Sequence, residues 1–274
     1  MKRILVPVDF SEYSIEALKV ASQIARKNHC EIILLHLLEL PHRVNDTFGD
    51  SKSIPEIIFF KNKAIENLEE LMESPFLKGI DVFESVEFNK VDLGVIDSSK
   101  KNNADLIIMG SHGTSGFKEL LVGSNTEKIV RYSTIPVLVI KKEAKEFKAT
   151  NFVFASDFSK ETIKPFRKML EFAKIFNSKL FLVTICTPSS FKTTNTTEKI
   201  MENFIANFDV ENYSTHIFND TNIENGIINF SKSINADLIG ICTHGRTGLA
   251  HFYNGSIGED LVNHASKPII TFKI

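Results

Sequence analysis

The sequence contains no tryptophan, only three cysteines and eight prolines, and thirteen glycines among 274 residues. The cysteines are Cys30, Cys186 and Cys242, which are too few for a disulfide framework and have no metal-ligand spacing. This excludes the small disulfide-rich and zinc-finger classes. Because unpaired cysteines persist best in a reducing compartment, we expect a cytoplasmic protein.

Long apolar runs and a strong charge of one sign are also missing. No stretch reaches the roughly 18 uncharged apolar residues that a membrane-spanning helix needs. The apolar run near the amino terminus stops at Asp9 and is too short for a signal peptide. The 32 Lys and Arg nearly balance the 34 Asp and Glu, for a net charge of −2. We therefore expect neither a membrane nor a nucleic-acid partner.

A duplication organises the chain. ILVPVDFS, from Ile4, aligns with FVFASDFS, which begins 148 residues later at Phe152. GVIDSSKKNNADLIIMGSHGTSG, from Gly94, aligns with GIINFSKSINADLIGICTHGRTG, which begins 132 residues later at Gly226. The smaller second offset means that the middle of the second copy is shorter. A charged segment at 141–150 separates the copies, so we expect domains at 1–142 and 148–274.

Within each copy, β-rich apolar runs alternate with helical patterns. In the first copy the runs lie at 3–8, 31–38, 82–88, 105–110 and 136–141, and helical patterns lie between them, the first with Ser11 as its N-cap. This alternation predicts an α/β fold, in which a parallel sheet carries helices on both faces and binds ligands beyond the carboxyl ends of its strands. We expect Phe59, Phe60, Phe76 and Phe83 to pack in the core or on helix faces.

Four glycines crowd into MGSHGTSGFKELLVGSNT, residues 109–126, directly after a predicted strand. Gly110 at the strand end would let a ligand approach the backbone, and Gly113 permits a positive φ that turns amides inward. Gly123 and Ser124 lie at a predicted helix start, where free amides and the helix dipole favour a phosphate. The alternative is that these glycines only turn the chain. Neither G-x-x-x-x-G-K-[ST] nor G-x-G-x-x-G occurs.

The strand ending in P-x-D, together with G-x-x-G, nine residues and then G-S, resembles the universal stress protein family. The resemblance covers essentially the whole chain as two tandem domains. It implies two Rossmann-like, adenine-nucleotide-binding open parallel sheets, each five-stranded in the order 3-2-1-4-5. It also implies a nucleotide site in the first copy at Pro7, Asp9, Leu37, Met109, Gly110, His112, Gly113, Gly123, Ser124 and Asn125.

The second copy departs from the family pattern. Cys242 stands at the position of Gly110, and Ala155 stands at that of Pro7. We expect a side chain at the Gly110 position to intrude on a close-packed ligand, leaving a weakened or vacant site. The corresponding second-copy positions are Asp157, Ile185, Cys242, Gly245, Gly255 and Ser256.

Several candidate residues also have a purely structural interpretation. Asp9 follows a strand and precedes Ser11, so it is also suited to cap a helix. His112 is as suited to a turn as to a phosphate. His36, within an apolar strand, is expected to be a hydrogen-bonded core residue. Cys242 is expected to be a small buried residue rather than a redox centre.

The sequence contains no evident catalytic or metal-ligand set, so ATP is expected as a bound effector, with Mg²⁺ held mainly by phosphates and water. The resemblance thus implies an ATP-binding sensor or regulator of the stress response. The alternatives are a slow ATPase or adenylyl-type enzyme and a nucleotide-free scaffold. Single-domain relatives pair through their last strands, so residues 136–141 and 268–274 are expected to pair within the chain as a pseudo-dimer. A homodimer of whole chains is a further expectation.

Overall fold

The computed structural model describes residues 1–39, 53–112, 123–141, 146–243 and 257–274. The elements of the first copy are β1 (Arg3–Pro7), α1 (Glu12–Asn28), β2 (Glu31–Leu38), α3 (Ser53–Met72), the 3-10 helix η1 (Pro75–Leu77), β3 (Val82–Phe88), α4 (Val91–Lys101), β4 (Leu106–Gly110), α5 (Ser124–Tyr132) and β5 (Val137–Ile140).

The second copy repeats this order. Its elements are β6 (Asn151–Ala155), the 3-10 helix η2 (Lys160–Thr162), α6 (Ile163–Phe176), β7 (Lys179–Cys186), α7 (Thr194–Ile205), β8 (Tyr213–Asn219), α8 (Ile223–Ser233), β9 (Leu238–Thr243), α9 (Ile257–His264) and β10 (Ile269–Lys273). The strands and helices expected from the sequence are therefore present, and the α/β fold is confirmed.

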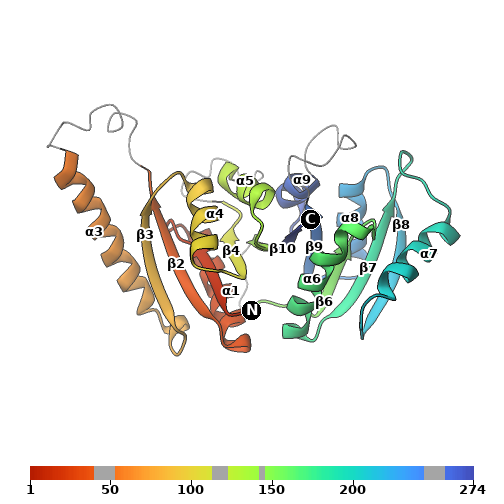
Figure 1. Cartoon of the computed structure of the whole chain (residues 1–274), viewed down its shortest axis with the longest axis horizontal. Coiled ribbons are helices and arrows are strands. Elements are labelled where there is room, and N and C mark those ends of the chain that lie inside the picture. Colours follow the sequence, from red (N-terminus) through yellow and green to blue (C-terminus); the bar gives the residue numbers. More distant parts are fainter. Residues whose placement is uncertain (40–52, 113–122, 142–145, 244–256) are drawn as a thin grey trace.

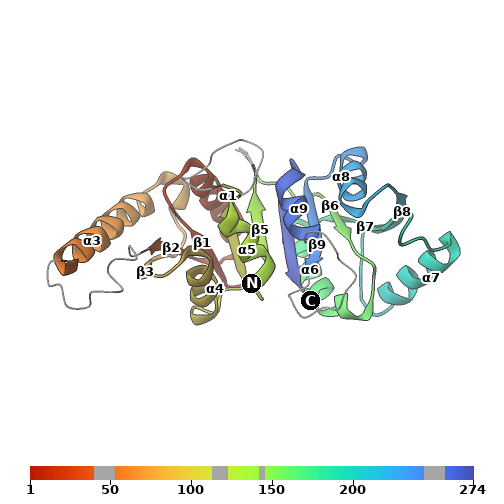
Figure 2. The same ribbon diagram turned by 90° about the horizontal axis from the view of Figure 1, so that it is seen from above.

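The strands form one ten-stranded sheet in the order β3-β2-β1-β4-β5-β10-β9-β6-β7-β8. Each half has the expected parallel order 3-2-1-4-5. The halves join where β5 and β10 pair antiparallel, with Val139 opposite Ile269 and Val137 opposite Thr271. The expected pairing of the last strands is therefore present, and it makes the two five-stranded orders into one continuous sheet. Figures 1 and 2 show the copies side by side, with β5 and β10 between them.

Side chains alternate between the two faces of the sheet, as the period of a strand requires. Ile4 and Val6 of β1 enter a core cluster under α1, α3, α6 and α7. Leu5 enters a second cluster under α4, α5, α8 and α9. Each cluster contains residues from both copies. The protein is thus a three-layer α/β/α structure whose two hydrophobic cores both cross the junction.

Three phenylalanines expected in the core are exposed. Phe59, Phe60 and Phe83 are 64%, 52% and 53% accessible, so the expectation is wrong for these residues. The reason is their place at the edge of the sheet: α3 lies beside the edge strand β3 (Figure 1) and buries only a narrow stripe that includes Ala64 and Leu68. Phe76 packs against the core as expected. In the part of the chain that the structure describes, no helix is long and apolar enough to cross a membrane.

The junction should make the two copies unfold together. Leu138 of β5 is fully buried opposite Ile270. We expect Leu138→Ala to cost about 2–5 kcal/mol, because it removes core contacts and leaves a cavity. Urea unfolding followed by circular dichroism, with hydrogen exchange resolved for amides of both copies, measures this loss. Tyr213→Ala at the far, exposed edge is the control, with an expected change within about 0.5 kcal/mol. Two separate transitions, with only first-copy amides losing protection, would contradict this expectation.

Candidate functional site

The candidate site lies at the carboxyl ends of β1 and β4. These two strands are neighbours, with Ile4 opposite Leu106 and Leu5 opposite Ile107. The chain leaves β1 toward β2 on one side, and β4 and β5 lie on the other side. This reversal of strand order is where open α/β sheets form a crevice for ligands. Pro7 ends β1 and Gly110 ends β4, so the structure brings these two predicted residues to the same edge.

Asp9 forms the turn that links β1 to α1. Its Oδ1 accepts hydrogen bonds from the Ser11 backbone N–H at 3.0 Å and from the Ser11 hydroxyl at 2.6 Å. Ser11 in turn caps α1, accepting from the Ser14 N–H at 3.3 Å, as its sequence position predicts. Phe10 between them has φ of 61°, a left-handed conformation that is costly for a residue with a side chain. Asp9 thus has a structural role in holding this turn, whatever it contacts beyond it.

The second copy builds the same turn. Phe158 has φ of 53°, and Asp157 Oδ1 accepts from the Ser159 N–H at 3.1 Å. The recurrence of the aspartate is therefore explained by the turn alone. Its presence in both copies does not by itself indicate two ligand sites.

β2 supplies the next side of the site. His36 Nδ1 lies 2.7 Å from the Val8 carbonyl oxygen, and its ring packs at a tilt 4.9 Å from the Phe10 ring. His36 is therefore hydrogen-bonded as expected, but it is half-buried and does not belong to the core. Leu37 points to α4, where a Cβ on Gly94 would lie 2.5 Å from the Leu37 Cδ2. Because the Leu37 side chain is packed against this helix, a ligand at this edge would meet mainly its backbone.

The start of α5 is fixed on the end of β4. The Gly123 N–H donates to the Ser111 carbonyl at 2.9 Å, and the Thr126 hydroxyl donates to the Gly110 carbonyl at 3.3 Å. Gly123 is the N-cap residue of α5, and no side chain of the described residues caps this end. Amides of the first turn, beginning at the exposed Ser124, are therefore available beside the strand end, where the positive end of the helix dipole favours an anion.

His112 lies against this edge. Its ring is 4.8 Å from the Tyr13 ring, and its Nδ1 is 2.9 Å from the Ser111 hydroxyl. The Nε2 atom is buried and has no hydrogen-bond partner among the described residues. When Ser111 donates to Nδ1, Nε2 carries the ring proton and can donate to an anion.

Gly110 has a packing reason to be glycine. A Cβ at this position would lie 2.7 Å from the Tyr13 carbonyl oxygen and 2.8 Å from its carbonyl carbon. The backbone of the first turn of α1 therefore packs so closely on position 110 that glycine is needed there, with or without a ligand. The sequence pattern indicated ligand contact at Gly110 and gave no sign of Tyr13, because the two residues are far apart in sequence and no local pattern links them. Met109 is 6% exposed in the core under α4 and α5, which leaves chiefly its backbone at the edge.

Some predicted residues lie outside the described part of the chain. Gly113 of the first copy, and Gly245, Gly255 and Ser256 of the second, lie outside the described residues. Asn125 is half-buried in the first turn of α5. Lys128 of the same helix lies 3.3 Å from Asp92 on α4, so this lysine supports helix packing. Among the described residues, no three His, Cys, Asp or Glu side chains cluster as a metal site.

The second copy has a pocket of about 350 Å³ at the corresponding edge. Asp157, Ile185 and Cys242 line it, so the structure brings together all three second-copy candidates that it describes. Much of its wall is apolar, formed by Ile185, Ile200, Ile223, Ile227, Ile241, Cys242 and Ile274. Gly226 packs against Ile185 as Gly94 packs against Leu37 in the first copy, because a Cβ on Gly226 would clash with Ile185 Cγ2.

Cys242 occupies the structural position of Gly110, opposite Phe272 of β10. If the second copy had a helix that began where α1 begins in the first, its first turn would meet the Cys242 Cβ. This region is instead the 3-10 turn η2, and α6 begins only at Ile163. Burial raises the pKa of the Cys242 thiol to about 12, and the negative charge of Asp157 adds to the effect. The thiol therefore stays protonated near neutral pH, although Cys242 is only partly buried and not fully buried as expected.

The fold and the sequence pattern repeated in both copies agree with comparisons to known proteins. The universal stress protein family matches residues 1–141 and again residues 149–273, so the chain belongs to this family. Universal stress protein MJ0577 of Methanocaldococcus jannaschii is 34% identical over 159 residues, which cover 52% of this chain and 96% of that protein. Relatives of that size correspond to one copy.

Two solved structures are also similar. A universal stress protein from Archaeoglobus fulgidus DSM 4304 superimposes on 99% of this chain and 98% of its own with a TM-score of 0.79, at 23% identity, which supports the tandem fold. A universal stress protein solved in complex with cAMP covers 52% of this chain and 98% of its own, with 20% identity and a TM-score of 0.36.

The packing reason for Gly110 is tested in protein without nucleotide. We expect Gly110→Ala to destabilise the protein by about 1–3 kcal/mol, because its Cβ would meet the Tyr13 backbone, which cannot move without shifting α1. Gly94→Ala is the control, since its Cβ meets mainly the movable end of Leu37. Denaturant unfolding compares them. A Gly110→Ala protein as stable as the wild type without ligand would leave ligand contact as the explanation.

The raised pKa of Cys242 predicts an unreactive thiol. An ordinary thiol has a pKa of 9.0, so at pH 8 the fraction of Cys242 present as thiolate should be lower by at least about a hundredfold. Native protein is treated with iodoacetamide, and labelling of the Cys242 peptide is followed by mass spectrometry, with urea-unfolded protein as the reference. Asp157→Asn should speed labelling by removing the negative charge. Above pH 9 the unfolded chain ionises first, so this group should reduce stability progressively as the pH rises toward 12. Native labelling as fast as in urea would overturn the assignment.

Proposed function

We propose that the first copy binds ATP at the carboxyl edge of β1 and β4, and that the chain is a nucleotide-dependent regulatory protein of the stress response. The observation that supports the proposal is that three candidate anion donors belong to the two segments that meet at the end of β4. They are the backbone N–H groups of the uncapped first turn of α5, the Ser124 hydroxyl and Nε2 of His112. The Gly123–Ser111 hydrogen bond holds the start of α5 on the end of β4. Such an arrangement suits a phosphate chain.

The adenosine end of the ligand is assigned to the β1 and β2 side. Pro7, Asp9 and the backbone of Leu37 border this side, and the turn at Phe10 orients the Asp9 carboxyl group. Gly113 completes the proposed site from the sequence pattern alone. Mg²⁺ would accompany the nucleotide, coordinated mostly by phosphate oxygens and water, which suits its preference for few protein ligands.

We propose regulation rather than turnover because phosphoryl transfer needs a positioned nucleophile and groups that neutralise developing charge. The side chains placed at the edge are suited to binding. Asp9 is engaged with Ser11, and the nearby cation Lys128 is paired with Asp92. A slow ATPase is the rival that steady phosphate release would favour. The cytoplasmic location and the association of whole chains into a dimer stay predictions.

The second copy is assigned a weaker or absent nucleotide site. Six of the sixteen residues that line its pocket are isoleucines, and a cysteine stands at the Gly110 position. The isoleucine part of the wall offers no hydrogen bond to a phosphate, and the carboxylate of Asp157, which also lines the pocket, repels one. This copy is the part of the chain that best fits the scaffold alternative.

The decisive test separates binding from folding. We expect Asn125→Glu to weaken ATP binding at least tenfold, since a negative charge in the first turn of α5 repels phosphate. The same charge suits the helix dipole, so the melting temperature should be unchanged or slightly higher. Isothermal titration calorimetry with ATP and Mg²⁺ measures the affinity, and Asn125→Gln is the matched neutral control.

Further outcomes distinguish the alternatives. Near one ATP per chain in wild type, unaffected by Asp157→Asn and weakened by Asp9→Asn, supports the first copy as the site. Binding of cAMP but not ATP would keep the site and change the ligand. Equal ATP affinity of the Glu and Gln variants at Asn125 would remove α5 from the site. No binding of any adenine nucleotide would leave the scaffold alternative, and continuous phosphate release would favour the ATPase.

A further inference from the structure

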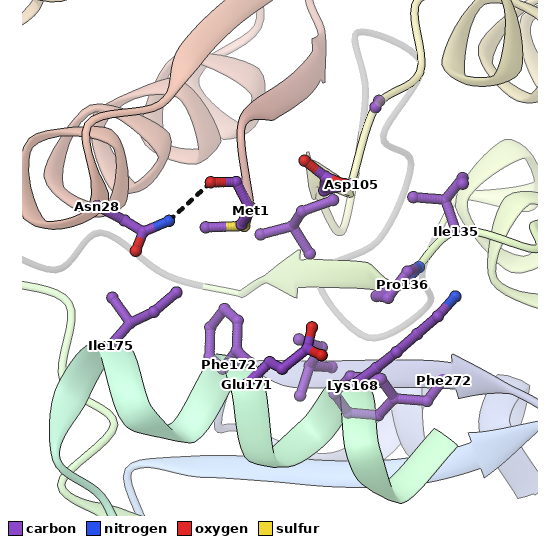
Figure 3. Close-up of a pocket in the computed structure, with 13 residues that line it drawn as sticks. Met1, Asn28, Asp105, Ile135, Pro136, Lys168, Glu171, Phe172, Ile175 and Phe272 are labelled. Atoms are coloured by element: carbon purple, nitrogen blue, oxygen red, sulfur yellow. Dashed lines mark hydrogen bonds between the residues drawn. The ribbon is translucent and has the colours of Figure 1, made fainter. Parts of the chain in front are cut away.

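A second pocket lies at the junction of the copies, on the opposite edge of the sheet from the candidate nucleotide site. It has a volume of about 190 Å³ and opens beside the amino ends of β1 and β4. Figure 3 shows α6 on one side and first-copy residues, including Met1, Ile135 and Pro136, on the other. The apolar lining comes from both copies: Met1, Ala104, Leu106, Ile135, Pro136, Phe172, Ile175, Ile270 and Phe272.

The internal duplication gives this pocket a counterpart. Residues of α6 correspond to residues of α1 at the 148-residue offset, so Glu171 matches Gln23 and Phe172 matches Ile24. Asn28 likewise matches Phe176, and Met1 matches Ala149. Because the copies are related through the antiparallel β5–β10 pair, the equivalent space lies on α1 beside the chain that enters β6.

Phe147 fills the counterpart space. It is 4% exposed and belongs to the core cluster that includes Ile24 and Leu138. Its ring lies 5.4 Å from the Phe176 ring, and its backbone N–H donates to Gln23 Oε1 at 2.7 Å. Phe176, which the ring contacts, corresponds to Asn28 of the junction pocket. Gln23, which accepts the hydrogen bond, corresponds to Glu171.

The junction pocket has the same kind of wall and an acceptor at the same place. Glu171 and Lys168 extend from α6 toward the first copy (Figure 3), and among the described residues neither has a hydrogen-bond or ion-pair partner. Asp105 accepts from the backbone N–H groups of Lys2 and Arg3. The volume fits one aromatic ring with a short attachment, since an apolar cavity of about 150 Å³ accepts benzene.

We propose that the junction pocket binds a phenylalanine-bearing segment of a partner polypeptide, in the way that the counterpart holds Phe147. The ring packs between Phe172 and the Ile135–Pro136 wall, and the backbone N–H of the phenylalanine donates to the Glu171 carboxylate. The occupant touches both copies, so its binding stabilises their junction.

The test uses as its probe the segment of this chain whose Phe147 fills the counterpart space. The acetylated and amidated peptide Glu-Phe-Lys-Ala-Thr, residues 146–150, is titrated into full-length protein labelled at isoleucine methyl groups. We expect saturable shifts at Ile135 and Ile270 of the pocket, at concentrations up to about 10 mM, because a contact this small binds weakly. The same peptide with alanine in place of phenylalanine should produce no shift.

Matched variants locate the binding. Ile175→Trp fills the pocket and should abolish the shifts, whereas Lys27→Trp, at the equivalent place beside the filled counterpart, should leave them. Glu171→Gln should retain affinity within about twofold, because glutamine accepts the same hydrogen bond at position 23. Glu171→Leu should weaken it at least about fivefold.

Phe147→Ala gives an internal standard. Opening the counterpart should let the same peptide shift Ile24 and Ile140 as a second site. Shifts there without shifts at Ile135 and Ile270, or no shifts at these two residues in wild type, overturn the proposal. Tighter binding of phenethylammonium, lost in Glu171→Gln, overturns it in favour of a small cationic ligand.

Discussion

The antiparallel pairing of β5 with β10 is the constraint on which the rest of the molecule depends. A sheet edge left unpaired exposes backbone donors and acceptors, and both of these strands consist of buried residues at the pairing positions. By joining two edges, the pair removes both from solvent and lets two hydrophobic layers run through the whole chain. The tandem chain therefore carries its own pairing partner, which is held at a fixed effective concentration.

Duplication with divergence has made the two copies different at the carboxyl edge. Both keep the Asp-Phe-Ser turn with its left-handed phenylalanine, because the helix that follows needs it. At the end of β4 the first copy keeps glycine and an α-helical start under Tyr13, while the second carries Cys242 and begins with a 3-10 turn. A single side chain at one strand end is thus accompanied by a different helix start and an isoleucine-rich pocket.

The same duplication explains the asymmetry at the amino edge. Residues 146–150 precede β6 and place Phe147 over α1, whereas Met1 stands at the position of Ala149 before β1. In the structure, one of the two related spaces is part of the core and the other is a pocket. The filled space is the basis for the occupant proposed for the pocket, because the two spaces share the fold, the kind of wall and the position of the acceptor.

The sequence by itself determined the repeat, the alternation of strands and helices, the strand order through the family resemblance, and Ser11 as a helix cap. These depend on local periodicity and on residue types whose preferences act over a few positions. Tertiary structure alone decided that Gly110 makes room for Tyr13, that Lys128 pairs with Asp92, and that Phe59, Phe60 and Phe83 are exposed beside an edge strand. It also joined the two five-stranded orders into one sheet with a shared core. Each of these facts depends on contacts between residues distant in sequence, and such contacts exist only once the chain has folded.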